Sequence, residues 1–486
     1  MTAVANVRTD AFIDGRFVAA ADGRTFDDVS PRDGSVIAQV ARGSAEDVDR
    51  AVRAARRAFE SGAWSLADPA QRKRVLLRLA ELIDEHAEEL AQLESADVGH
   101  PIGDARGVDV PGARNCFAWY AEAIDKVYGE IAPTGVDALA LVSREPVGVV
   151  GAVVPWNYPL IITAWKLAPA LATGNSVILK PAEQSPLSAL ALAELAAEAG
   201  LPDGVLGVVP GFGEEAGEPL GRHPDVDKIA FTGSVEVGRL FLRYAGESNG
   251  KAVSLELGGK SPHVVLANAG DVDAAVQAIG WGIFYNAGQT CHAGSRVVAE
   301  RSVADALADR LVDFAREFVP ADPALPDTKL GALVSEEHLR GVLGRVERAS
   351  ADGARVLVGG QRAEPVAGGA YMYPTVLEAP DPGAPIVQEE VFGPVLALQR
   401  ADDLEHAVRL ANGTGYGLAA AVWSSNVTTA HRVARRLRAG TVWVNTFDVS
   451  SLTTPFGGFK ASGQGRDRSL HALDSYTQLK TTWIAL

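Results

Sequence analysis

Cysteine is scarce in this chain of 486 residues, in which Cys116 and Cys291 are the only two thiols. Two cysteines so far apart in the sequence provide neither a disulfide framework nor a zinc-binding cluster. We therefore expect no metal site. A reducing compartment is the simplest interpretation, and we expect a cytoplasmic protein.

An excess of positive charge is also lacking, since the formal net charge is -16 at pH 7. A broad surface for nucleic acid or anionic lipid needs clustered Lys and Arg, so we expect no nucleic-acid or membrane partner. Net charge does not exclude a small anionic cofactor, because a helix N-terminus and a single Lys can create a local positive site.

Segments that could enter a membrane are missing as well. Residues 1–10 contain no apolar stretch that could be the core of a signal peptide. Two long uncharged stretches, residues 146–165 and 274–295, are interrupted by prolines, glycines and polar side chains. Neither stretch could form a continuous helix with all of its backbone hydrogen bonds made in lipid. We therefore expect a soluble protein in which both stretches are buried.

The composition is that of a globular protein, with 47% hydrophobic and 22% charged residues. The chain is too long for one ordinary hydrophobic core, so two or more packed units are expected. A hairpin is predicted at Phe12-Ile13-Asp14-Gly15, and helical patterns cover residues 44–93 and 101–128.

Strands and helices then alternate in two series, which is typical of parallel β-α-β units. The first series comprises strands at 147–154, 176–179, 205–209 and 228–231 and helices at 160–172, 186–199 and 235–245. The second begins near residue 262 and comprises helices at about 271–285, 302–317 and 335–351 and strands near 355, 394, 420 and 442. The chain should cross between two α/β domains near residues 256–262. Residues 138–144 and 475–484 also look extended, and their distance from both series suggests a role between subunits.

Three strand ends carry residues that suit a nucleotide. Lys180 and Glu183 follow one strand, where an ammonium and a carboxylate can bind ribose hydroxyls and the carboxylate would repel a 2′-phosphate. Gly233 and Ser234 precede a helix whose free N–H groups attract a diphosphate. Each feature has an ordinary alternative, namely a solvated charge pair at a loop and an N-cap serine. The segment around Gly213 is a weak glycine motif, interpreted mainly as a loop.

Cys291 follows an apolar segment and a flexible Gly-Gln pair, where nearby N–H groups can stabilise a thiolate. Glu256 stands between two leucines, where burial would raise its pKa toward that of a useful general base. Asn157 and the Cys291 N–H can donate to a developing oxyanion. Taken singly, these features also fit a packed thiol, a strand with one polar face and a turn-forming Asn. His292 is not expected to serve Cys291 as a base, because adjacent side chains usually diverge.

These motifs, taken together and in order, resemble those of the aldehyde dehydrogenase superfamily over essentially the whole chain. The segments that carry the likeness are Pro155-Trp156-Asn157, Leu179-Lys180-Pro181, Phe231-Thr232-Gly233-Ser234, Leu255-Glu256-Leu257-Gly258-Gly259-Lys260-Ser261-Pro262, Asn286-Ala287-Gly288-Gln289-Thr290-Cys291, Glu390-Val391-Phe392-Gly393-Pro394 and Pro455-Phe456-Gly457-Gly458.

The resemblance implies an NAD domain of variant Rossmann type, a catalytic domain and a small β arm that builds dimers or tetramers. We assign residues 1–123 and 147–258 to the first, 259–458 to the second, and 124–146 with 459–486 to the arm and its bridging segments. The cofactor is expected to be NAD rather than NADP. Its implied binding residues are Trp156, Lys180, Glu183, Gly213, Gly233, Ser234, Glu390 and Phe392.

The implied reaction oxidises an aldehyde to an acid through a Cys291 thioester that Glu256 helps to hydrolyse. The implied substrate tunnel comprises Tyr158, Trp165, Tyr285, Thr290, His292, Asp448, Ser450 and Phe456. No Arg or Lys stands among these residues, so an uncharged or a cationic aldehyde is expected.

Two alternatives and one departure accompany this prediction. A coenzyme A-acylating dehydrogenase would share the fold, but some such members lack the Glu at position 256. A non-catalytic scaffold would be expected to lose Cys291, Glu256 or Asn157. The sequence departs from the hydrolytic pattern at Asp467-Arg468-Ser469, where a Glu-Leu-Gly type sequence is usual, so a proton-relay role there is in doubt.

Overall fold

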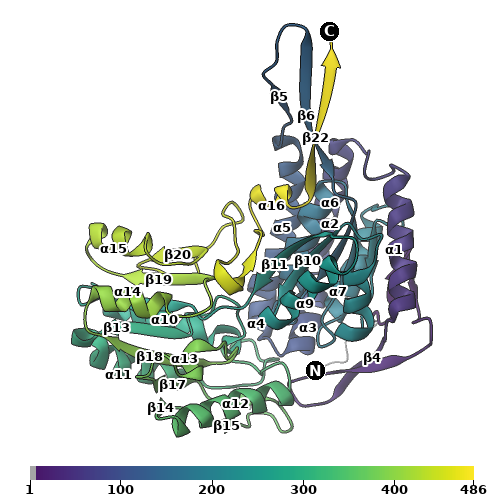
Figure 1. Cartoon of the computed structure of the whole chain (residues 1–486). Coiled ribbons are helices and arrows are strands. Elements are labelled where there is room, and N and C mark those ends of the chain that lie inside the picture. The colour runs from purple at the N-terminus through teal and green to yellow at the C-terminus, as the bar shows by residue number, and fades with distance from the viewer. Residues whose placement is uncertain (1–6) are drawn as a thin grey trace.

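Two large sheets with helices on their faces, a small three-stranded sheet and two short two-stranded sheets make up the described part of the protein (Figure 1). The computed structural model describes residues 7–486. Residues 1–6, which belong to the N-terminal segment expected to contain no signal peptide, lie outside the described residues. Among the described residues, no helix is both long enough and apolar enough to cross a membrane.

The first sheet has eight strands, and its central strands run parallel. In spatial order they are β2 (Arg16–Val18), β1 (Ala11–Ile13), β9 (Leu206–Val208), β8 (Ser176–Lys180), β7 (Val149–Val153), β10 (Lys228–Gly233), β11 (Ala252–Leu257) and β21 (Gly463–Gln464). The predicted hairpin is confirmed, because Asp14 and Gly15 have φ of 54° and 76° in the turn between β1 and β2.

Helices cover both faces of this sheet, and the strands supply apolar side chains to each. Val149 and Val153 of β7 pack into one cluster, whereas Val150 and Ala152 pack into the other, as the two-residue period of a strand requires. The first cluster contains α1 (Ala45–Glu60), α8 (Glu218–Arg222) and α9 (Val235–Gly246). The second contains α2 (Pro69–Glu85), α3 (Ala87–Val98), α5 (Val110–Ala123), α6 (Pro159–Ala172) and α7 (Leu187–Glu198).

The second sheet has seven strands and begins directly after the predicted crossing point. In spatial order they are β14 (Arg355–Val358), β17 (Thr375–Glu378), β18 (Val395–Ala401), β13 (Arg296–Glu300), β12 (Pro262–Val265), β19 (Ala419–Trp423) and β20 (Thr441–Val444). The helices α10 (Val272–Phe284), α11 (Arg301–Glu317), α12 (Glu336–Ala351) and α13 (Pro385–Gln388) cover one face, and α14 (Leu404–Asn412) and α15 (Val427–Ala434) the other. The predicted fold class is confirmed.

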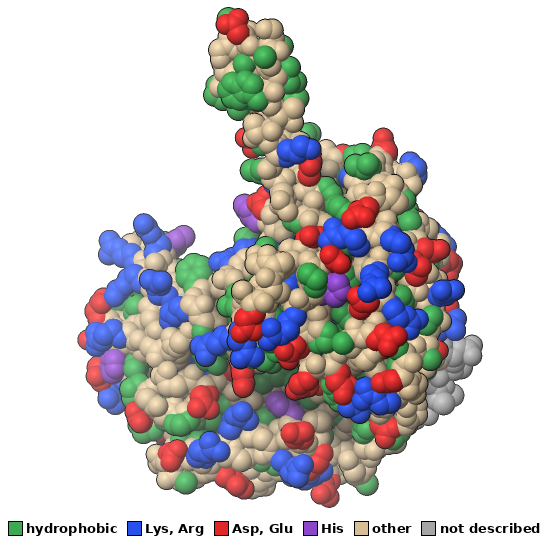
Figure 2. All heavy atoms as spheres, turned by 45° about the vertical axis from the view of Figure 1, so that its right-hand side comes forward, with side chains coloured by type: hydrophobic (Ala, Val, Ile, Leu, Met, Phe, Trp, Pro, Cys, Tyr) green, Lys and Arg blue, Asp and Glu red, His purple; other side chains and the backbone are tan. Residues whose placement is uncertain are grey.

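The third sheet is an arm that projects from the body (Figure 1). It comprises β5 (Glu130–Ala132), β6 (Ala138–Pro146) and β22 (Thr477–Ala485), and β22 pairs antiparallel with β6 along its whole length. Both segments predicted to be extended therefore lie in one sheet. Figure 2 shows hydrophobic side chains gathered on the arm. Its exposed large apolar residues are Tyr128, Ile131, Val136, Leu141, Leu479, Trp483, Ile484 and Leu486.

One predicted segment is divided more finely in the structure, and another differs from the prediction. Residues 44–93 are helical as predicted and form α1, α2 and most of α3; Gly62, with a positive φ, follows α1, and Pro69 starts α2. The segment around Gly213 is a helical turn (Gly213–Gly217) that leads into α8, not a loop.

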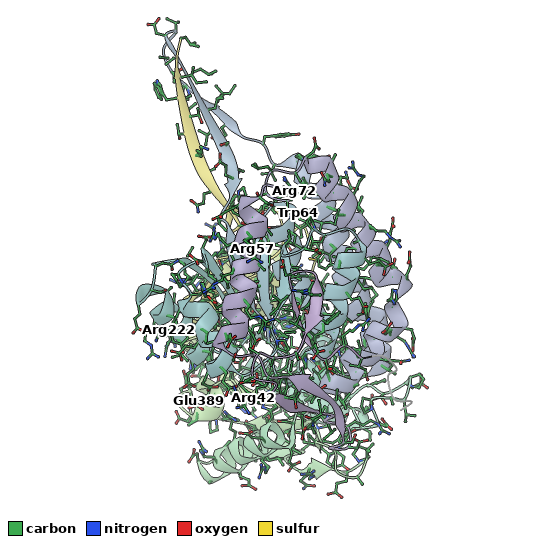
Figure 3. All side chains as sticks on the ribbon, turned by 90° about the vertical axis from the view of Figure 1, so that its right-hand side faces the viewer. Arg42, Arg57, Trp64, Arg72, Arg222 and Glu389 are labelled. Carbon is green, nitrogen blue, oxygen red and sulfur yellow. The ribbon has the colours of Figure 1, made fainter. Side chains whose placement is uncertain are left out.

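The C-terminal end of α6 is closed by side chains from the N-terminal helical region (Figure 3). Trp64, which is fully buried, donates its indole N–H to the Leu171 carbonyl at 3.1 Å, and Arg72 donates to the Ala172 carbonyl at 3.2 Å. The last carbonyls of a helix have no partner within it, so these two bonds satisfy them and fix the helix end. The opposite end of α6 begins at the candidate active site.

Candidate active site

The loop that carries Cys291 has an unusual backbone conformation. Asn286, Ala287 and Gly288 have consecutive φ angles of 47°, 52° and 70°. Left-handed conformations cost energy for residues other than glycine and persist where the surrounding structure enforces them. At Gly288 a Cβ atom would lie 2.2 Å from the Gly393 carbonyl oxygen, so no larger residue fits there. The strained loop places Cys291 at the wall of a cavity.

The electrostatics at Cys291 differ from the sequence prediction. Burial and the neighbouring Glu256 carboxylate raise the pKa of the thiol well above its usual value, although the His292 N–H opposes this. The thiol is therefore the resting form, and a base must remove its proton. The expectation that the His292 ring diverges is wrong, because its Nδ1 lies 3.7 Å from the Cys291 Sγ while its Nε2 bonds the Asp448 carboxylate at 2.7 Å.

Glu256 lies near the end of β11 with only 3% of its surface exposed. Burial raises the pKa of its carboxyl group to about 8. Neither carboxyl oxygen has a hydrogen-bond partner among the described residues, and a buried carboxyl without a protein partner can bind a water molecule. Lys166 and Asp467, whose side chains bond each other at 2.5 Å, act on this pKa in opposite directions: the Lys166 charge lowers it and the Asp467 charge raises it.

Asn157 is tied to the cysteine loop by two hydrogen bonds. Its Nδ2 donates to the Gln289 carbonyl at 2.8 Å, and its own carbonyl accepts from the Asn286 side chain at 2.9 Å. A side-chain amide has two N–H donors, so one stays free for a substrate oxygen. The Cys291 N–H donates to no acceptor in the described part of the chain. The two candidate oxyanion donors, Asn157 Nδ2 and the Cys291 N–H, therefore lie at the same loop.

A cleft opens at the carboxyl ends of β7, β8 and β10. Parallel sheets bind ligands at these strand ends. The cleft is lined by six of the predicted cofactor residues, namely Trp156, Lys180, Glu183, Gly213, Gly233 and Ser234. The buried Lys180 Nζ lies 3.2 Å from Glu183 Oε2, and Ser234 caps α9 by accepting from the Val237 N–H. Thr232 lines the same cleft, and its buried hydroxyl has no described hydrogen-bond partner. The residues present therefore fit a dinucleotide.

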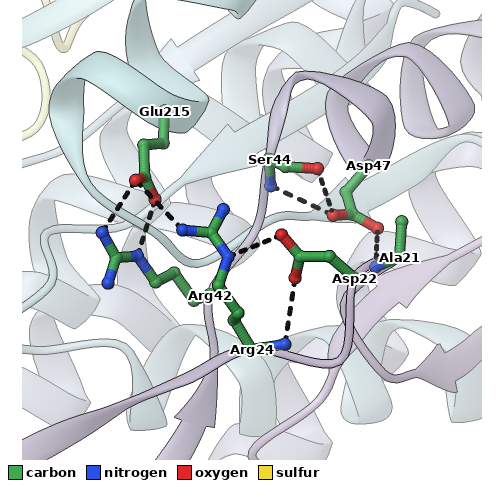
Figure 4. Close-up of polar contacts among 7 residues, drawn as sticks. All are labelled: Ala21, Asp22, Arg24, Arg42, Ser44, Asp47 and Glu215. Carbon is green, nitrogen blue, oxygen red and sulfur yellow. Dashed lines mark hydrogen bonds and ion pairs between the residues drawn. The ribbon is translucent and has the colours of Figure 1, made fainter.

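The Gly213 turn is held against the body by an ion-pair cluster (Figure 4). Arg42 makes two hydrogen bonds of 2.7 Å to the Glu215 carboxylate, and Arg24 approaches the same group at 3.4 Å. Asp47 fixes the start of α1 beside them by accepting from the Ser44 and Ala21 N–H groups. These contacts anchor one wall of the cleft to the N-terminal segment.

The last two predicted cofactor residues, Glu390 and Phe392, do not line the cleft. Glu390 accepts from the Gly259 N–H at 3.1 Å, and burial raises its pKa to about 7. A Cβ atom at Gly258 would overlap this carboxylate, which explains the glycine there. The rings of Phe392 and Trp156 have centroids 5.2 Å apart, so Phe392 contacts a residue that lines the cleft.

The cavity at Cys291 contains seven of the eight predicted tunnel residues, namely Tyr158, Trp165, Tyr285, His292, Asp448, Ser450 and Phe456. Thr290 does not line it, because its hydroxyl turns to the Tyr158 hydroxyl at 2.7 Å. Sequence reasoning missed Ile161 and Ile162, which share a helix face with Tyr158 and Trp165 and could have been found from that spacing. The expectation that no Arg or Lys stands in this cavity is wrong, because Arg468 lines it.

Comparisons with known proteins agree with this geometry. The model of the aldehyde dehydrogenase family matches residues 17–482. The NADP/NAD-dependent aldehyde dehydrogenase PuuC of Escherichia coli is 51% identical, over 98% of this chain and 95% of its own length. The aminoacetaldehyde dehydrogenase of Pseudomonas aeruginosa is 50% identical over the same shares.

Solved structures are equally similar. An indole-3-acetaldehyde dehydrogenase in complex with NAD+ has a TM-score of 0.98 and 50% identity, covering 99% of this chain and 97% of its own. A γ-glutamyl-γ-aminobutyraldehyde dehydrogenase from Burkholderia cenocepacia has a TM-score of 0.97 and 55% identity with the same coverage. The chain belongs to the aldehyde dehydrogenase family and is an NAD(P)-dependent enzyme that oxidises aldehydes, with NAD as a supported cofactor.

Proposed function

We propose that Cys291 forms a covalent bond to the aldehyde carbon and that Glu256 then activates the water that releases the carboxylic acid. The observation that carries this proposal is the pairing of a half-buried thiol with a buried carboxyl group whose oxygens have no hydrogen-bond partner among the described residues other than that thiol. Few other roles account for such a carboxyl, because burying it without a partner costs free energy.

In the first step the Cys291 sulfur attacks the carbonyl carbon and gives up its proton. Glu256 and His292 Nδ1 are the two acceptors beside the thiol. Asn157 Nδ2 and the Cys291 N–H steady the oxyanion of the thiohemiacetal. NAD, when bound, accepts the hydride from this carbon. The proton taken from the thiol first passes to solvent, so that Glu256 is ionised. Glu256 then takes a proton from water as the water oxygen attacks the thioester carbon. The Cys291 thiolate leaves as the acid forms and recovers that proton from Glu256.

The cleft residues fit the parts of the cofactor. Lys180 and Glu183 would hold the adenosine ribose, the start of α9 at Gly233 and Ser234 would receive the diphosphate, and Glu390 would hold the nicotinamide ribose. The Glu183 carboxylate disfavours a 2′-phosphate, so NAD binds more tightly than NADP. In this assignment residues 1–123 and 147–258 form the NAD domain and residues 259–458 the catalytic domain.

Glu256 also separates this function from the coenzyme A-acylating alternative. A carboxylate at that position suits water as the acyl acceptor, whereas transfer to a thiol does not need it. The deciding experiment is product analysis of a complete reaction with and without coenzyme A. We expect free carboxylic acid in equal yield in both; acyl-coenzyme A as the main product would contradict the proposal. A non-catalytic scaffold would form no NADH with any aldehyde.

The arm is proposed to assemble a homodimer or homotetramer. It presents β-strands with exposed Ile131, Leu141 and Trp483 away from the body of the protein. Exposed apolar side chains on unpaired strand edges favour pairing with a neighbouring sheet. Sedimentation of the full chain tests this, and a monomer at micromolar concentration would refute it. We retain the cytoplasm as the proposed location.

A further inference from the structure

We infer that Arg468 binds a carboxylate at the far end of the substrate, so that this enzyme prefers aldehydes that also carry an acid group. The inference rests on the proposed function, because it needs the aldehyde end of the same molecule to reach Cys291. Both residues line one cavity.

Arg468 is a buried cation without a counter-ion. Only 5% of its surface is exposed, and no described carboxylate lies within ion-pairing distance of its guanidinium. The two nearby carboxylates are already bound, Asp467 to Lys166 and Asp448 to His292. An unpaired buried charge is costly, so such a group usually has a partner when the site is in use.

The guanidinium also keeps donors free. Its Nη2 donates to the Ser451 carbonyl, but its buried Nε has no hydrogen-bond partner among the described residues. Its Cζ atom lies over the rings of Trp165 and Phe456, at 5.4 and 5.8 Å from the ring centroids. Contacts with ring faces leave the N–H edge available for an acceptor. A planar guanidinium matches a carboxylate, which it can bind through two parallel hydrogen bonds.

The backbone at Arg468 adopts an energetically unfavourable conformation. Arg468 and the next residue, Ser469, have φ angles of 63° and 53°, and two successive left-handed residues that are not glycine are unfavourable. Phe456 and Asp467 exchange two backbone hydrogen bonds of 2.8 Å, and the Ser469 N–H donates to the Leu452 carbonyl at 2.8 Å. These hydrogen bonds hold the segment at the cavity wall. Such an enforced backbone conformation is expected where the position of a side chain matters to function.

The experiment compares each semialdehyde acid with the uncharged aldehyde of the same length: succinate semialdehyde with butanal, glutarate semialdehyde with pentanal, and adipate semialdehyde with hexanal. The measured quantity is the ratio of the two kcat/KM values. We expect this ratio to exceed one in the wild type at one or more lengths. Arg468→Met should lower it by about 30-fold or more, mainly through KM, because truncating a buried charge partner has an effect of that size. Arg468→Lys should give an intermediate ratio, because lysine keeps the positive charge but lacks the planar pair of N–H donors that matches a carboxylate.

The matched control is Arg466→Met, the same substitution at a nearby residue that does not line the cavity. Its ratio should equal that of the wild type, and thermal unfolding should show that all variants are folded. A structural role of Arg468 would change both kcat/KM values alike. The inference is overturned if the wild-type ratio is below one at every length, or if Arg468→Met changes it less than about threefold. If Arg468→Met does not fold, the wild type and Arg468→Lys decide alone. Failure of the proposed function looks different, since acyl-coenzyme A would then be the main product or Cys291→Ser would retain a normal burst of NADH.

Discussion

The pH dependence of thioester hydrolysis is the sharpest test of the role proposed for Glu256. Burial raises the pKa of this carboxyl group to about 8, and only its ionised form can accept a proton from water. A group with that pKa is about one-tenth ionised at pH 7 and about nine-tenths ionised at pH 9. The rate constant for hydrolysis should therefore rise about tenfold over this range and level off above it.

The assay is stopped-flow detection of NADH with a saturating aldehyde. The burst reports formation of the thioester, and the steady rate that follows reports its hydrolysis where hydrolysis is the slow step. Glu256→Gln should retain a burst, because His292 Nδ1 also lies near the thiol, but its steady rate should be low and should not rise through pH 8. If the variant keeps the wild-type steady rate, or both proteins show the same rising limb, Glu256 is not the base.

The remaining predictions concern the groups around Glu256. Cys291→Ser should abolish both the burst and the steady rate, because a hydroxyl is a poor nucleophile without a strong base; a normal burst would disprove the covalent mechanism. Asn157→Ala should lower the burst rate by roughly 100- to 1000-fold, the usual loss for one oxyanion donor, and a change below about tenfold would exclude that role. Asp467→Asn should move the midpoint of the pH profile to lower pH, because the Asp467 charge raises the pKa of Glu256 and its loss also frees the Lys166 charge, which lowers it. A shift to higher pH would contradict this electrostatic account.

Much of the architecture follows from local sequence patterns. Apolar, β-branched strands alternate with helices, and this period is a property of neighbouring residues, so both sheets and the crossing near Gly258 were predictable. The two extended segments of the arm were also found, because each has a strand pattern apart from either series. The boundaries within residues 44–93 and the helical turn at Gly213 were missed, because packing against the rest of the chain decides where such short segments bend.

The chemistry of the site was only partly predictable. The residue types at positions 157, 256 and 291 suit acyl chemistry, and motif order brought them together by resemblance. Their protonation could not be predicted, because the pKa of Cys291 depends on burial and on a carboxylate from another strand. The sequence suggested a thiolate stabilised by N–H groups, whereas the folded protein favours the thiol.

Local sequence determined which segments become strands, helices and turns, because those preferences depend on residues a few positions apart. Tertiary structure alone decided which side chains meet. It turned Thr290 toward Tyr158, brought His292 between Cys291 and Asp448, and placed Arg468 in the substrate cavity. Positive backbone φ angles and contacts between residues far apart in the chain set these positions, and no short-range pattern encodes either of them.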